Sequence, residues 1–128
     1  MSIDRTILIA DDDRELRSGM AEFLAELGAD ILQAESGSEA LELLRRRSLS
    51  LALLDMHMPG HTGLEVLTTV RRETLATPCM IWSADMTEGL QQMALREGAL
   101  CVLKKPVEPL TLRREVQRVL QLDPEIGG

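Results

Sequence analysis

Two groups of carboxylates directly follow apolar runs of the chain, and these residues are the best candidates for chemistry. Asp55 ends the run 51–54, while Asp11 and Asp12 end the run 6–10. If the two runs are neighbouring strands, the three carboxylates meet at one edge of a sheet, where desolvation and mutual repulsion oppose their ionisation. A hard cation relieves that repulsion, and carboxylate oxygens are ligands that Mg²⁺ prefers. The cluster therefore predicts a magnesium site.

Two other polar residues lie near the ends of later apolar runs. Ser83 ends the run 78–83, and Lys105 follows the run 100–103. A hydroxyl donor and a cation beside a metal site are the groups that stabilise a transferring phosphoryl group. A carboxylate can itself act as the nucleophile and form an acyl phosphate. Together these residues predict phosphoryl transfer to a carboxylate.

The elements that must position these residues alternate between strand and helix. The pattern predicts strands over 6–10, 30–34, 51–54, 78–83 and 100–103, and helices over 14–27, 36–47, 62–72, 87–97 and from 109 onward. Near-continuous apolar strands separated by helices are typical of a doubly wound parallel α/β sheet covered on both faces. The site of such a sheet lies at the carboxyl ends of its strands. Asp13 is interpreted as a helix N-cap and Trp82 as a core residue.

Composition excludes several other classes of protein. The 128 residues suit one domain, and the net charge of −7 disfavours a nucleic-acid-binding surface. No stretch reaches the ~18 apolar residues of a membrane span, so we expect no membrane association and a cytoplasmic location. Cys79 and Cys101 lie within apolar runs and are interpreted as core residues rather than a disulfide or metal ligands.

The ordered set of motifs resembles the receiver domain of bacterial two-component response regulators. The resemblance covers nearly the whole chain, and it implies a flavodoxin-like, five-stranded parallel sheet of order 2-1-3-4-5. Its motifs are Asp11-Asp12, Asp55 with the Met58-Pro59-Gly60 turn, Ser83-Ala84 and Lys105-Pro106.

This resemblance implies a role for each site residue. Asp55 would accept a phosphoryl group from a histidine kinase or phosphotransfer protein. Asp12 and Asp55 would hold Mg²⁺ together with the backbone carbonyl of His57, and Asp11 would support the waters of the metal. Such a domain assists its own phosphorylation and dephosphorylation but turns over no separate substrate.

The resemblance also implies that Ser83 and Lys105 bind the phosphoryl oxygens. Lys105 is preferred to Lys104 because the family pattern is Lys followed by Pro. Val102 departs from the family, which usually has an aromatic residue or His three positions before this Lys. We therefore hypothesise that the signal leaves through the loop after Ser83 and the 87–97 helix. His57 and Asp85 occupy positions that tune the lifetime of the phosphoryl group.

Two alternatives from other function classes stay open. A haloacid-dehalogenase-type phosphohydrolase would use Asp11 as nucleophile in an Asp-x-Asp pattern with Asp13, although this leaves Asp55 unexplained. A non-phosphorylated docking module would bind partners without any chemistry, but such modules usually lack an acidic residue or the Lys, and none is missing here.

The predicted domain covers residues 1–122, with a tail or the start of a linker at 123–128. We expect the 87–121 face to bind an output partner or a second copy of the chain as a homodimer.

Overall fold

The computed structural model describes residues 5–120, which form five strands and five helices in strict alternation. The strands are β1 (Thr6–Ala10), β2 (Asp30–Ala34), β3 (Leu51–Asp55), β4 (Cys79–Ser83) and β5 (Val102–Lys104). The helices are α1 (Arg14–Ala25), α2 (Gly37–Arg46), α3 (Gly63–Arg72), α4 (Glu88–Arg96) and α5 (Pro109–Leu120). The predicted domain end at 122 and the tail at 123–128 lie outside the described residues.

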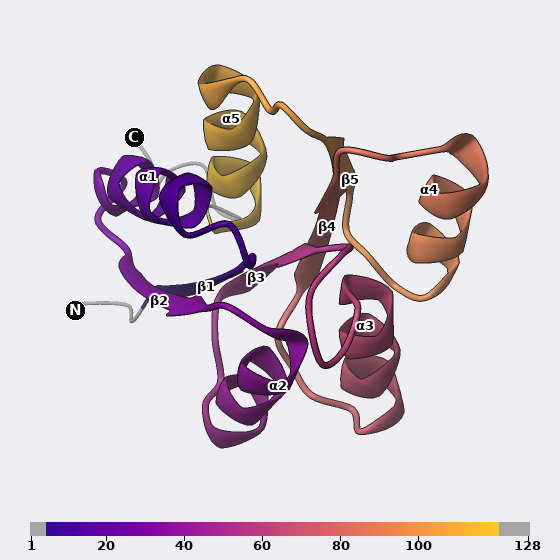
Figure 1. Cartoon of the computed structure of the whole chain (residues 1–128). Coiled ribbons are helices and arrows are strands. Elements are labelled where there is room, and N and C mark those ends of the chain that lie inside the picture. Colours follow the sequence, from indigo (N-terminus) through magenta and orange to yellow (C-terminus); the bar gives the residue numbers. More distant parts are fainter. Residues whose placement is uncertain (1–4, 121–128) are drawn as a thin grey trace.

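The strands form one parallel sheet in the order β2-β1-β3-β4-β5, which confirms the predicted fold (Figure 1). The chain adds β2 on one side of β1 and β3 on the other, so the strand order reverses between β1 and β3. Ala10 pairs with Leu54 across this point, and Asp55 pairs with Trp82 on β4. The carboxyl ends of the central strands therefore share one edge, as the position of the predicted site requires.

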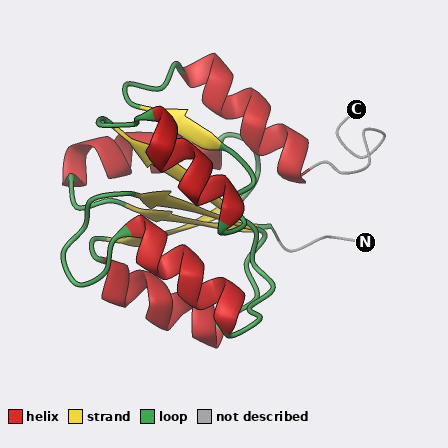
Figure 2. Cartoon of the chain, turned by 90° about the vertical axis from the view of Figure 1, so that its right-hand side faces the viewer, coloured by secondary structure: helices red, strands yellow, loops and turns green. Residues whose placement is uncertain are grey.

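Helices cover both faces of the sheet, which lies as a middle layer between them (Figure 2). Successive side chains of β1 point to opposite faces. Ile7 and Ile9 belong to the apolar cluster formed with α1 and α5, whereas Leu8 and Ala10 belong to the cluster formed with α2, α3 and α4. All four are fully buried. The continuous apolar runs of the sequence thus reflect strands that are buried on both sides.

Side-chain caps begin four of the described helices. Asp13, Ser36, Thr62 and Thr87 each accept a hydrogen bond from the backbone N–H three residues later. The Thr62 cap is a complete capping box, because the Glu65 side chain also accepts from the Thr62 N–H at 2.8 Å. The predicted capping role of Asp13 is confirmed.

The predicted bounds of β5 were wrong by two residues at its start. Leu100 donates its N–H to the Cys79 carbonyl at 2.8 Å, but its side chain is 48% exposed and the paired strand begins only at Val102. Lys104 extends the strand by pairing with Ser83, while its own side chain is exposed. Apolar character at Leu100 therefore does not mark a sheet position.

Both cysteines are free thiols, as predicted. Cys79 is buried, and this burial raises the pKa of its thiol to about 12. Cys101 is half-buried, and burial together with the nearby Glu115 carboxylate raises the pKa of its thiol to about 11. Both side chains stay protonated and pack as small apolar residues. Across residues 5–120, no helix has the length and apolarity needed to cross a membrane.

Candidate functional site

Three carboxylates meet at the edge of the sheet where the strand order reverses. Asp11 and Asp12 follow β1, Asp55 ends β3, and one oxygen from each of the three side chains lies within 4.8 Å of the others. Asp11 is fully buried and Asp55 is 4% exposed, whereas Asp12 is exposed. Adjacent parallel strands that both end in carboxylates thus produce the acidic cluster predicted from the sequence.

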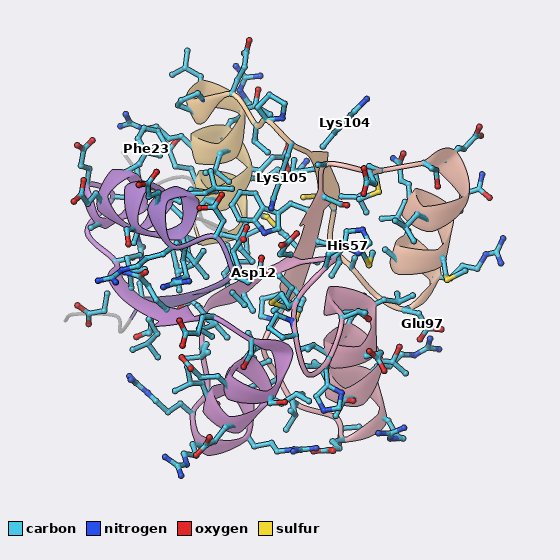
Figure 3. All side chains as sticks on the ribbon, viewed as in Figure 1. Asp12, Phe23, His57, Glu97, Lys104 and Lys105 are labelled. Atoms are coloured by element: carbon cyan, nitrogen blue, oxygen red, sulfur yellow. The ribbon has the colours of Figure 1, made fainter. Side chains whose placement is uncertain are left out.

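Lys105 supplies the positive charge inside this cluster. Its Nζ lies 2.8 Å from Asp11 Oδ2 and 3.1 Å from Asp55 Oδ1, and its side chain is 16% exposed. Lys104, in contrast, is exposed and points away from the site (Figure 3). The loop after β5 carries Lys105 to the cluster, and the Lys105 N–H donates to the Ser83 carbonyl at 2.9 Å. Of the two adjacent lysines, only Lys105 reaches the carboxylates.

The pKa values of Asp55 and Lys105 are both raised, for different reasons. Burial, together with the negative charge of Asp11, raises the pKa of Asp55 despite the opposing effect of Lys105. Burial alone would lower the pKa of Lys105, but its hydrogen bond and ionic contact with Asp11, and those with Asp55, raise it. Lys105 therefore stays charged, and the site retains an excess of negative charge that one ammonium group does not neutralise.

Hydrogen bonds fix the orientation of the Asp11 carboxylate. Its Oδ1 accepts from the Asp13 N–H at 2.9 Å, and its Oδ2 accepts from Lys105. The Asp13 side chain turns away to cap α1, accepting from the Leu16 N–H at 3.1 Å. Asp13 is thus engaged elsewhere, which disfavours the Asp-x-Asp pairing that the phosphohydrolase alternative requires.

The donor set fits a hard divalent cation. All three side chains offer oxygen atoms, two of them are buried, and the exposed Asp12 leaves one side of the cluster open to solvent. Oxygen donors, an open side and surplus negative charge are the conditions under which proteins bind Mg²⁺. The residues present therefore fit the predicted ion.

Ser83 lies at the carboxyl end of β4 and is fully buried. Its Oγ accepts a hydrogen bond from the Asp85 N–H at 3.1 Å, which shapes the turn after the strand. Within residues 5–120, the Ser83 hydroxyl has no hydrogen bond to Asp55. The structure therefore places Ser83 at the site edge but does not join it to the carboxylates.

His57 lies on the loop after β3, with its side chain exposed (Figure 3). Its Nε2 is 3.6 Å from Asp85 Oδ2, so the loops after β3 and β4 meet across this pair. The backbone N–H of His57 hydrogen-bonds to the Asp55 carboxylate and partly offsets the rise of the Asp55 pKa. His57 thus contacts the phosphoacceptor candidate through its backbone and its neighbouring loop through its side chain.

One buried residue of this region, Arg17, was not predicted from the sequence. Arg17 on α1 is 7% exposed, and its Nη1 donates to the backbone carbonyl of Asp11 at 2.7 Å. Its spacing to Met20, Ala21 and Leu24 places it on the buried stripe of α1, which is the sequence signal that identifies it.

Next to the site, an apolar cavity of about 510 Å³ lies between α1, α5 and the ends of β4 and β5. The sequence pattern did not predict it. Its wall includes Phe23 and Trp82, the only two aromatic residues of the chain, and also Lys105. Trp82 is 1% exposed, which confirms its predicted core position.

With this geometry in place, comparison with known proteins assigns the family. The family model of the response regulator receiver domain matches residues 7–117. The chain belongs to this family. Receiver domains are signalling modules of two-component systems, so the predicted resemblance is confirmed.

Curated relatives agree with this assignment. A response regulator receiver protein of Anaeromyxobacter is 38% identical over 103 residues, which are 80% of this chain and 43% of that protein. The transcriptional activator protein ExaE of Pseudomonas putida is 34% identical over 89% of this chain and 54% of that protein. An uncharacterised 14.6 kDa protein of Leptolyngbya boryana is 39% identical over 88% of this chain and 87% of its own length. The chain thus spans about half the length of the first two relatives.

Solved structures support the receiver fold. The receiver domain of the Francisella response regulator 1452 is 27% identical with a TM-score of 0.87, covering 92% of this chain and 98% of that one. The chemotaxis protein CheY4 of Vibrio cholerae is 28% identical with a TM-score of 0.84, covering 92% of this chain and all of that one (100%).

Proposed function

We propose that the protein is a phosphorylation-activated signalling switch whose phosphoacceptor is Asp55. The observation that carries this proposal is the contact of Lys105 Nζ with both Asp11 and Asp55, at 2.8 and 3.1 Å, inside a cluster of three carboxylates. An ammonium group held beside a strand-end carboxylate is positioned to neutralise charge on a phosphoryl group attached there. The family supports the same role, because receiver domains are signalling modules.

We infer that the donor is the phosphohistidine of a histidine kinase or phosphotransfer protein. A carboxylate oxygen of Asp55 attacks phosphorus in line with the phosphorus–nitrogen bond. The new phosphorus–oxygen bond forms as the phosphorus–nitrogen bond breaks, and the leaving imidazole nitrogen keeps the electron pair and takes up a proton. Lys105 and the Ser83 hydroxyl then bind the oxygens of the transferred group. No separate substrate is turned over, and the exchange occurs in the cytoplasm, where such kinases use ATP.

Four residues of the site form the proposed Mg²⁺ site. Asp12, Asp55 and the backbone carbonyl of His57 would bind the ion directly, and Asp11 would bind its waters. When bound, Mg²⁺ supplies positive charge to the phosphoryl oxygens. Asp11 also orients Lys105 through their hydrogen bond, so this carboxylate serves both cations.

The proposed output surface is the 87–121 face, of which the structure describes residues 87–120. Large apolar side chains are exposed there, with Met93 47%, Leu95 45% and Leu110 69% accessible. A partner protein that recognises the phosphorylated form would bury them, and a homodimer of this chain is the other occupant to be tested. The domain boundary at residue 122 is part of the same proposal.

Intact mass after incubation with acetyl phosphate and Mg²⁺ tests the proposal. We expect one phosphoryl adduct, dependent on Mg²⁺ and removed by base, that disappears in Asp55→Ala and maps to Asp55 by peptide analysis. An adduct that maps instead to Asp11 would favour the phosphohydrolase. If neither acetyl phosphate nor a phosphohistidine donor gives an adduct while Mg²⁺ still changes the Trp82 fluorescence, the protein is a docking module.

A further inference from the structure

The indole ring of Trp82 lies directly against the ammonium group of Lys105. Lys105 Nζ is 4.7 Å from the centroid of the ring, within the ~6 Å range in which a cation is attracted to the face of an aromatic ring. Trp82 is 1% exposed, so little solvent screens the interaction. Trp82 thus borders the same ammonium group that contacts Asp11 and Asp55.

The backbone holds Trp82 in a rigid position beside the candidate phosphoacceptor. Trp82 pairs with Asp55 in the register between β3 and β4, and its carbonyl accepts the Met56 N–H at 2.9 Å. Its side chain belongs to the apolar cluster formed with α1 and α5. The ring is therefore fixed relative to Asp55.

Lys105, in contrast, reaches the site on a long and intrinsically flexible side chain. Such a chain loses conformational entropy when it is ordered. The two carboxylates attract the ammonium group, and the indole ring lies against the same group. An aliphatic residue at position 82 would fill space but would attract no cation.

The indole N–H supports a role for the ring beyond packing. Trp82 Nε1 is buried and, within the described residues, has no hydrogen-bond partner. Burying a donor without a partner is unfavourable, so a compensating interaction of the ring is expected. Tryptophan binds cations more strongly than the other aromatic side chains do, and the contact with Lys105 is such an interaction.

We propose that Trp82 is a positioning residue, whose ring face holds the Lys105 ammonium between Asp11 and Asp55 in readiness for the phosphoryl oxygens. This inference rests on the proposed role of Lys105 in phosphoryl transfer. Trp82 itself touches no reacting atom and acts only through Lys105.

Fluorinated tryptophans test the proposal because the chain contains a single Trp. Biosynthetic replacement by mono-, di- and trifluorotryptophan weakens the negative potential of the ring face with little change in ring size. We expect the rate of Asp55 phosphorylation by acetyl phosphate, at saturating Mg²⁺, to fall stepwise to about one fifth across the series. In the Lys105→Met background, we expect the same phosphorylation rate for every tryptophan analogue, and a lower rate than with Lys105 present. The proposal would be overturned if the phosphorylation rate stays constant across the series when Lys105 is present. It would also be overturned if the rate falls equally with Lys105 and with Lys105→Met.

A second measurement does not depend on phosphorylation. Thermal unfolding of Trp82→Leu, Lys105→Met and the double variant forms a double-mutant cycle. We expect the effects of the two substitutions to be coupled. The unfolding equilibrium constant of the double variant should be about five-fold smaller than the value obtained by adding the effects of the two single substitutions. Additive effects would overturn the proposal. If Trp82→Leu does not fold, the trifluorinated protein replaces it in the cycle. Failure to phosphorylate Asp55 would refute the proposed function and leave the result of this cycle unaffected.

Discussion

Arg17 donates a hydrogen bond of 2.7 Å from its buried guanidinium to the backbone carbonyl of Asp11, and a second bond of 2.9 Å from Nε to Gln33 Oε1. α1 is thereby tied to the loop that carries the acidic pair. Arg17→Met leaves the buried Asp11 carbonyl without this donor. We expect a loss of about 2 kcal/mol in the free energy of unfolding, measured by urea denaturation.

Mg²⁺ affinity, followed through Trp82 fluorescence, should fall in the same Arg17→Met variant because the Asp11 loop is less firmly held. Arg113→Met is the matched control, since Arg113 is exposed on α5. Equal effects of the two substitutions on stability would show that the contact with Asp11 contributes nothing.

Asp55 contributes unfavourably to stability when it is ionised without a bound cation. Burial and the charge of Asp11 raise its pKa above the ordinary value of a carboxyl group. A raised carboxyl pKa means that the folded state binds the proton more tightly than the unfolded state, so stability is lost as pH rises through the folded-state pKa. Asp55→Asn should therefore melt at a higher temperature than wild type at pH 7 in the presence of EDTA.

The stability advantage of Asp55→Asn should shrink as pH falls toward 4, because protonation makes the wild-type Asp55 side chain neutral, as asparagine is. Thermal unfolding across this pH window checks the prediction. Asp12→Asn is the control, since Asp12 is exposed and its substitution relieves little desolvation. A stability gain that is independent of pH would contradict the electrostatic explanation.

Gly63 allows α3 to begin directly against the backbone of Asp55. A Cβ at this position would lie 2.4 Å from the Asp55 carbonyl oxygen, a clash with backbone that no side-chain rotation removes. Gly63→Ala should lower the free energy of unfolding by about 1–3 kcal/mol. It should also slow phosphorylation, because Asp55 and the start of α3 must move apart.

Gly19 provides the opposite control for the glycine substitution. It lies within α1, and an added Cβ would meet nothing within 4 Å. Gly19→Ala should therefore raise stability by about 0.5–1 kcal/mol through helix propensity. Urea denaturation of both variants separates a specific contact at Gly63 from a general effect of replacing glycine.

The sequence predicted those features of the molecule that depend on local pattern. Strand ends carry the carboxylates, because apolar runs followed by Asp11 and Asp55 mark buried strands that stop at the sheet edge. The strand order came from the family resemblance and not from periodicity. The sequence did not predict the contact between Arg17 and Asp11 or the close approach of Gly63 to the Asp55 backbone. Both depend on distances between separate elements. The predicted strand also ended one residue too early, because Lys104 is charged and yet pairs with Ser83 in the sheet.

His57 and Asp85 should lengthen the lifetime of the phosphoryl group on Asp55. His57 Nε2 lies 3.6 Å from Asp85 Oδ2, and the pair joins the two loops that border the site. We expect His57→Ala and Asp85→Ala each to shorten the lifetime, because opening this contact widens the approach of water. The decay of the adduct in each variant, followed by intact mass, measures the effect.

The double variant His57→Ala/Asp85→Ala should decay no faster than either single variant, since one contact is lost in all three. Additive shortening, or no change in either single variant, would refute a shared role.

Val102 should be dispensable for transmitting the signal, whereas Ser83 should not. Val102 is half-buried on β5 and packs against the cluster formed with α2, α3 and α4, but it has no ring that could turn inward. Ser83 is fully buried at the start of the loop that leads to α4, and its Oγ accepts from the Asp85 N–H. A phosphoryl group that draws the Ser83 hydroxyl toward itself would therefore pull on this loop directly.

Phosphorylation should change the amide NMR signals of residues 88–96 equally in wild type, Val102→Ala and Val102→Tyr, and Ser83→Ala should abolish most of the change. Equal loss in the Val102 and Ser83 variants would show that the signal passes through β5 instead.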